Sequence, residues 1–106
     1  HCGQVVNPEG AKTQVEGAIA YGLSAALHGE IKIENGIITT SNFHNYPVMR
    51  LPEMPEVSVS FVKTTQPPTG LGEPGLPPIA PAVANAIYRL THQRLRKLPF
   101  SRELKA

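Results

Sequence analysis

The chain has 106 residues, of which 41% are hydrophobic and 17% charged, and its formal net charge is +2. This length and composition suit one globular domain and exclude a highly charged disordered chain. The small net charge gives no support for a nucleic acid partner, the single cysteine excludes an internal disulfide, and no apolar run approaches the ~20 residues of a membrane span.

The first third of the chain predicts a short strand followed by a long helix. Residues 2–7 are a strand candidate, and Asn7 followed by Pro8 is typical of an N-cap and the first helical position. Apolar residues then recur at helical spacing from Val15 to Leu27, which predicts one amphipathic helix. Small residues at positions 17, 18, 20 and 22 indicate that another backbone or a ligand approaches this helix closely.

The middle of the chain predicts antiparallel strands. Residues 29–43 alternate in part between apolar and polar side chains around Asn35-Gly36, which is typical of a type I′ hairpin turn. Three prolines in residues 44–55 favour an extended connector. Residues 56–63 again alternate, as in a half-buried strand.

A second helical stripe runs from Ala80 to Leu95. Proline is tolerated only in the first turn of a helix, so Pro81 predicts a helix start near residues 78–80. The resulting order of elements predicts an α+β fold, with an antiparallel sheet of three to four strands and two main helices packed on it. Residues 1–106 are expected to form a single domain.

Glu73 is the first candidate functional residue, because it stands in the segment GLGEPG immediately before the second predicted helix. Glycine and proline set the backbone geometry there, and a carboxylate in a fixed position can act as a general base. The alternative is a solvated glutamate in an ordinary turn. The glycines do not form a phosphate-binding fingerprint, because no further glycine follows at the required spacing after a strand.

Gln14, near the start of the first predicted helix, is the second candidate. Its neutral amide could bind the polar edge of a cofactor, and Gly17 and Ala18 would allow close approach. The alternative is an exposed helical glutamine. The four histidines show no pair at helical ligand spacing, so no metal-ligating side chains are predicted.

Six of the ten basic residues gather between positions 89 and 105, which leaves two interpretations. They could form a nucleic-acid patch, or they could be cations favoured near a helix C-terminus. Few aromatic residues stand nearby to stack on bases, which favours the second interpretation.

Four segments together resemble one known family over essentially the whole chain: CGQVVNP, QVEGAIAYGL, ENGIITTSNFHNYPVMRLPEMPEVSV and GLGEPGLPPIAPAVANAIYRLTHQRLRKLP. They are similar to the C-terminal end of the molybdopterin-binding large subunit of the xanthine dehydrogenase and aldehyde oxidase family. The branch that they resemble most is that of the isoquinoline 1-oxidoreductase beta subunit and related bacterial aldehyde dehydrogenases. The combination of QVEGA and GEPG is more specific than either motif alone.

The resemblance implies a molybdenum hydroxylase that oxidises N-heterocycles or aldehydes with water as the oxygen source. Its cofactor would be molybdopterin cytosine dinucleotide, with iron–sulfur clusters on a small partner subunit. In the family, the glutamate of the GEP motif lies beside the metal and accepts a proton, so Glu73 matches the general base. Gln14 matches the glutamine that contacts the cofactor, and Gly72 matches part of the pocket wall.

The resemblance also sets limits. Gly75 stands where purine-oxidising relatives carry a second proline, which argues against purine specificity. Residues 1–106 are expected to be a C-terminal fragment that needs the remainder of the molybdenum subunit as its partner, so the isolated chain is predicted to be inactive. A non-catalytic structural or protein-interaction module of the same fold is the alternative. The substrate and the cellular compartment stay open.

Overall fold

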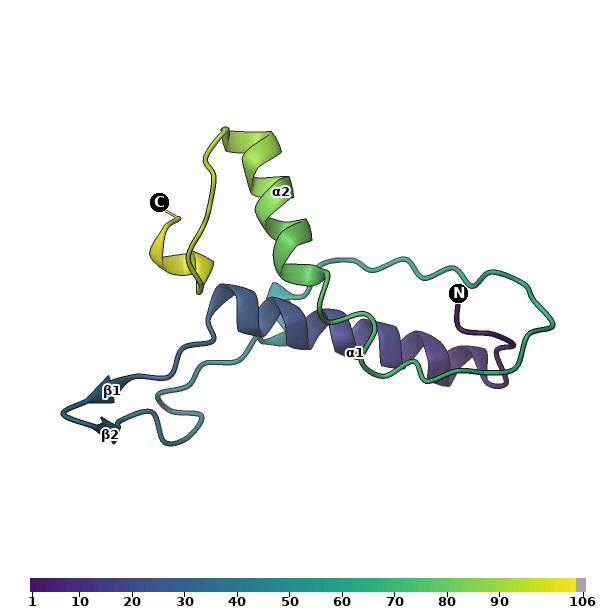
Figure 1. Cartoon of the computed structure of the whole chain (residues 1–106), viewed down its shortest axis with the longest axis horizontal. Helices are drawn as coiled ribbons and strands as arrows, with labels where there is room; N and C mark the ends of the chain where they lie inside the picture. Colours follow the sequence, from purple (N-terminus) through teal and green to yellow (C-terminus); the bar gives the residue numbers. More distant parts are fainter. Residues whose placement is uncertain (105–106) are drawn as a thin grey trace.

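The computed structural model describes residues 1–104 and has two long helices joined through irregular segments (Figure 1). The elements in chain order are α1 (Pro8–Leu27), β1 (Ile33–Glu34), β2 (Ile37–Ile38), the 3-10 turn η1 (Leu51–Glu53), α2 (Ile79–Thr91) and the 3-10 turn η2 (Phe100–Arg102). The molecule measures 53 × 35 × 25 Å, because the hairpin and the segment that leads to α2 extend away from the place where the helices meet.

Helix α1 begins where the sequence predicts it. The Asn7 side chain accepts a hydrogen bond from the Gly10 backbone N–H at 3.0 Å, and Pro8 occupies the first helical position. The buried residues of the helix are Ala18, Gly22, Leu23 and Ala26. They belong to the predicted apolar stripe, so the helix and its buried face are confirmed.

Helix α2 also begins in the predicted window, with Pro81 in its first turn. It ends at Thr91, since His92 adopts a left-handed conformation with φ of 58°. Leu95 therefore lies outside the helix, although it was predicted to continue the helical stripe. It is nevertheless buried, because the chain turns back after His92 and returns Leu95 to the core.

The two helices approach each other at small residues. A Cβ atom added to Gly22 would lie 2.8 Å from the Ile79 side chain and 3.1 Å from the Leu76 carbonyl oxygen. One added to Gly75 would lie 3.1 Å from the Ala18 Cβ atom. The small side chains of α1 therefore let α2 and the loop before it pack directly onto the helix backbone.

The core lies at the end of α1 that is nearer to its C-terminus. Ala26, Leu95 and Phe100 form a buried cluster, and half-buried side chains of α2 pack against it. The last segment is held there by Glu103, whose carboxylate accepts hydrogen bonds from the backbone N–H groups of Arg96 and Lys97 at 2.8 and 3.3 Å. The chain thus closes on α1 after α2.

The hairpin has the predicted turn. Asn35 and Gly36 have φ angles of 50° and 78°, and the antiparallel register pairs Ile33 with Ile38 and Glu34 with Ile37. However, the sheet of the described residues has two strands rather than three to four. Neither helix packs on it, because the hairpin projects beyond the end of α1 (Figure 1).

The expected strands at 2–7 and 56–63 do not form within the described part of the chain. Residues 56–63 are extended, with Val57, Val59 and Phe61 half-buried and Ser58 and Ser60 exposed, but no hydrogen bond joins their backbone to another described residue. A strand needs a neighbour to satisfy its backbone groups. Near the N-terminus, single backbone bonds from Gln4 N–H to Gln66 O and from Thr69 N–H to Cys2 O replace a ladder.

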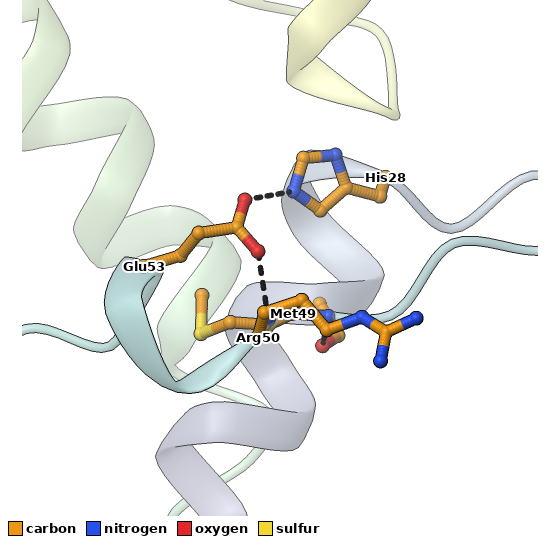
Figure 2. A network of polar contacts seen from close by, with 5 residues as sticks. His28, Met49, Arg50 and Glu53 are labelled. Atoms are coloured by element: carbon orange, nitrogen blue, oxygen red, sulfur yellow. Dashed lines mark hydrogen bonds and ion pairs between the residues drawn. The ribbon is translucent and has the colours of Figure 1, made fainter.

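The connector after the hairpin is fastened to the end of α1 (Figure 2). The Met49 backbone N–H donates to Ser24 Oγ at 2.7 Å. The Glu53 carboxylate accepts from the Arg50 backbone N–H at 2.7 Å and lies 3.5 Å from His28 Nε2. These contacts fix the path of the proline-containing segment that was predicted to be a connector.

Candidate functional site

A groove with a volume of about 650 Å³ runs between α1 and the loop that precedes α2. Helix α1 lines it with Thr13, Gln14, Gly17, Ala18 and Tyr21. The loop lines it with Gly72, Glu73, Leu76 and Pro77. All three residues proposed from the sequence, Gln14, Gly72 and Glu73, therefore face the same space although they lie about sixty positions apart.

Gln14 reaches across this groove toward the loop. A Cβ atom built on Gly72 would lie 3.5 Å from Gln14 Oε1, an ordinary van der Waals distance. Position 72 could therefore hold an alanine methyl group, but that methyl group would stand between the loop and the amide. Glycine at this position keeps the Gln14 end of the groove open.

Glu73 is exposed at the start of a tight turn. Its carbonyl oxygen accepts from the Leu76 backbone N–H at 2.9 Å, and the Ile79 N–H donates to the Leu76 carbonyl at 3.2 Å. The loop thus runs through consecutive hydrogen-bonded turns into α2, which positions the backbone of Glu73. Among residues 1–104, no group forms a hydrogen bond or ion pair with the Glu73 carboxylate. The carboxylate is free to interact with a molecule in the groove.

The groove combines a carboxylate, a neutral amide and an exposed stretch of helix backbone at Gly17, where an added Cβ would meet nothing within 4 Å. Among the described residues, no three His, Cys, Asp or Glu side chains gather as metal ligands. These donors are suited to the polar edge of an organic group and to proton transfer, rather than to holding a metal ion directly. They fit a cofactor that brings its own metal ligands.

The sequence interpretation did not include Thr13 and Tyr21 in this site. Tyr21 follows Gln14 by seven residues, so the two side chains leave the helix in almost the same direction, and Gly17 lies between them on that face. This second stripe, beside the apolar one, was the available signal.

No helix among residues 1–104 combines the length and the apolar character needed to cross a membrane.

Comparisons with known proteins relate most of the chain to one group. The profile of the molybdopterin cofactor-binding domain family matches residues 1–55. The chain is 43% identical to isoquinoline 1-oxidoreductase subunit beta of Brevundimonas diminuta and 42% identical to the membrane-bound aldehyde dehydrogenase (pyrroloquinoline-quinone) of Gluconacetobacter polyoxogenes, each over 92% of this chain. Quinoline 2-oxidoreductase from Pseudomonas putida 86 has a similar fold over 93% of this chain and 14% of its own, with a TM-score of 0.77 at 23% identity.

The chain spans 12% of the length of each of these two curated relatives. The similarity in fold supports the α+β class and the placement of the two helices. The family profile covers more than half of the 106 residues. The chain therefore belongs to the molybdopterin cofactor-binding domain family, and its resemblance to the large subunits of the xanthine dehydrogenase and aldehyde oxidase family is confirmed.

Proposed function

We propose that the chain is the C-terminal part of the large subunit of a molybdenum hydroxylase, and that the enzyme oxidises N-heterocycles or aldehydes with water as the oxygen source. The observation that carries this proposal is the common groove of Gln14, Gly72 and Glu73 in a chain of the molybdopterin cofactor-binding family. The names of two relatives, an isoquinoline oxidoreductase and an aldehyde dehydrogenase, support the two substrate classes.

In this proposal Glu73 is the general base. Its carboxylate is exposed to the groove, has no partner among the described residues, and is carried by a turn that the Leu76 N–H closes. A carboxylate with these properties accepts a proton from a group placed within hydrogen-bond reach. The stiff GLGEPG segment keeps the carboxylate at this distance during substrate binding and product release.

Gln14 binds and orients the cofactor. Its amide can donate or accept at the polar edge of a pterin, and Gly72 leaves that edge room to approach. When bound, the cofactor supplies the metal centre that takes up two electrons from the substrate. We assign it as molybdopterin cytosine dinucleotide, the form that the resemblance implies.

The proposed partners are those that the family resemblance implies. A small iron–sulfur subunit would take up the electrons, since the single cysteine of this chain cannot hold a cluster. The remainder of the large subunit would cover apolar side chains that are exposed among the described residues, such as Phe43 and Leu51. It would also supply a neighbouring strand to residues 56–63, whose backbone groups have no partner among the described residues.

Replacement of Glu73 by glutamine in the intact enzyme tests the proposed base. The amide keeps the size of the side chain but cannot accept the proton in the same way, so turnover should fall by about 10²–10⁴-fold. Molybdenum and pterin contents, measured by metal analysis and by fluorescence of the oxidised pterin, should stay at the level of the unmodified enzyme.

Glu34→Gln is the matched control, since Glu34 is an exposed carboxylate at the hairpin turn, outside the groove. It should leave turnover unchanged. Near-normal turnover of Glu73→Gln would refute the assignment of the base. Loss of molybdenum from Glu73→Gln would instead give Glu73 a role in retaining the cofactor.

A non-catalytic structural or protein-interaction module of the same fold is the alternative. The exposed apolar side chains at the hairpin, among them Ile33, Ile37 and Phe43, are the observation that favours it, because they fit a protein surface as well. The gene discriminates between the two functions. An upstream reading frame for the rest of a large subunit, next to a gene for a small iron–sulfur protein, supports the enzyme, whereas a free-standing gene of this length supports the module.

A further inference from the structure

Among residues 1–104, Tyr21 is the one large aromatic side chain that lines the groove, and packing in the core does not explain its position. It is 70% exposed and takes no part in the buried cluster or in the side chains packed against it. Among residues 1–104, no hydrogen bond involves its hydroxyl group. Packing and hydrogen bonding within the described chain therefore do not explain an aromatic residue at this position.

The face of α1 between Gln14 and Tyr21 can support a flat group. It lies two helical turns after Gln14, which places the two side chains about 10 Å apart along the axis of α1 and on nearly the same face. Between them, Gly17 has no side chain and an added Cβ would meet nothing within 4 Å. A flat group can lie over the bare backbone at Gly17 with an aromatic ring at one end and an amide at the other.

A second hollow of about 290 Å³ lies beside the groove, toward the connector after the hairpin. Gly17 and Tyr21 belong to both spaces. Tyr21 thus stands between the two spaces, two helical turns from Gln14. Its exposed ring is therefore accessible to a planar group in the groove.

We propose that Tyr21 is a binding residue whose ring stacks on a planar heteroaromatic group in the groove and directs the polar edge of that group toward Gln14 and Glu73. This inference rests on the function proposed above. Rings of this kind come from two sources, the pterin of the cofactor and an N-heterocyclic substrate. Stacking on an aromatic side chain changes affinity by about 5- to 150-fold, the equivalent of about 1–3 kcal/mol measured for nucleic-acid bases.

The experiment compares Tyr21→Phe, Tyr21→Leu and Tyr21→Ala in the intact enzyme. Lys12→Ala is the control, because Lys12 is an exposed side chain of the same helix that does not line the groove. Pterin and molybdenum contents report on the cofactor. The affinity for isoquinoline, measured by equilibrium binding, reports on the substrate side.

Tyr21→Phe should match the unmodified enzyme, whereas Tyr21→Leu and Tyr21→Ala should both lower one of the two quantities. A severalfold loss of pterin identifies the cofactor as the stacked group, and an affinity for isoquinoline about tenfold weaker at normal pterin content identifies the substrate. The proposal is overturned if the leucine variant keeps both quantities, or if Tyr21→Phe is as damaged as Tyr21→Leu. Because pterin content and ligand affinity are measured without turnover, the result stands even if Glu73→Gln disproves the base.

Discussion

The place where α1, α2 and the C-terminal segment meet differs sharply from the two outer segments, the hairpin and residues 56–63. At the meeting place, Gly22 lies directly against Ile79, and Phe100 is buried with 4% of its surface exposed. In the hairpin, by contrast, all three strand isoleucines are exposed, and residues 56–63 have no backbone partner among the described residues.

The difference shows which part of the chain positions the groove. Gln14 comes from α1, and Glu73 comes from the loop whose next residues pack on Ala18 and Gly22. Both groups are therefore held by contacts within the chain. The outer segments hold no groove residue and expose the apolar side chains that a neighbouring protein surface would cover.

The largest difference in stability between the two regions is expected when one phenylalanine in each region is truncated. Phe100→Ala removes a buried ring from the core cluster and should lower the free energy of unfolding by about 3–5 kcal/mol. Phe43→Ala removes an exposed ring and should change it by about 0.5 kcal/mol or less. Urea unfolding of the two variants, followed by helical circular dichroism, measures both effects. Equal losses would contradict the division into a packed region and an outer region.

A smaller effect is expected from adding one methyl group to α1. Gly22→Ala would place a Cβ atom 2.8 Å from the Ile79 side chain, so α2 must shift, at a cost of about 1–3 kcal/mol in the free energy of unfolding. Gly17→Ala is the matched control. Its methyl group would meet nothing within 4 Å, and the higher helix propensity of alanine should stabilise the chain by about 0.5–1 kcal/mol. The thermal unfolding midpoints of the two variants should therefore move in opposite directions.

Local signals in the sequence predicted the helices and the turn well. The Asn7-Pro8 start of α1, the start of α2 near Pro81 and the Asn35-Gly36 turn are each determined by residues a few positions apart. The strand count was not predictable in the same way. Residues 56–63 have the alternation of a strand, but pairing depends on a neighbour that the described chain does not contain.

The candidate site was predictable only with the help of the family resemblance. Gly17 and Ala18 indicated close approach to α1, but spacing alone could not bring Gln14 and Glu73 together. Their proximity arises from the packing of the loop at Gly75 on Ala18, a long-range contact. Tyr21 was missed because its position on the helix matters only once the loop is in place. The roles of Gln14, Gly72 and Glu73 stay predictions.

The smallest predicted effect concerns the connector, the part of the outer chain that is fastened to α1 (Figure 2). Glu53→Ala removes the acceptor of the Arg50 N–H and the contact with His28, while the Met49 bond to Ser24 remains. Because the Glu53 side chain is 47% exposed, water replaces much of what is lost, and the free energy of unfolding should fall by about 1 kcal/mol or less.

Hydrogen exchange detects this change better than global unfolding does. The Arg50 and Glu53 amides should exchange faster in Glu53→Ala, whereas amides in the middle of α1 should not change. Glu56→Gln is the control, since its side chain makes no hydrogen bond or ion pair within residues 1–104. In all variants the amides of 56–63 should exchange fast, because nothing described protects them. Slow exchange there in the isolated chain would mean that the segment finds a strand partner, and the contrast between the fastened and the free segment would disappear.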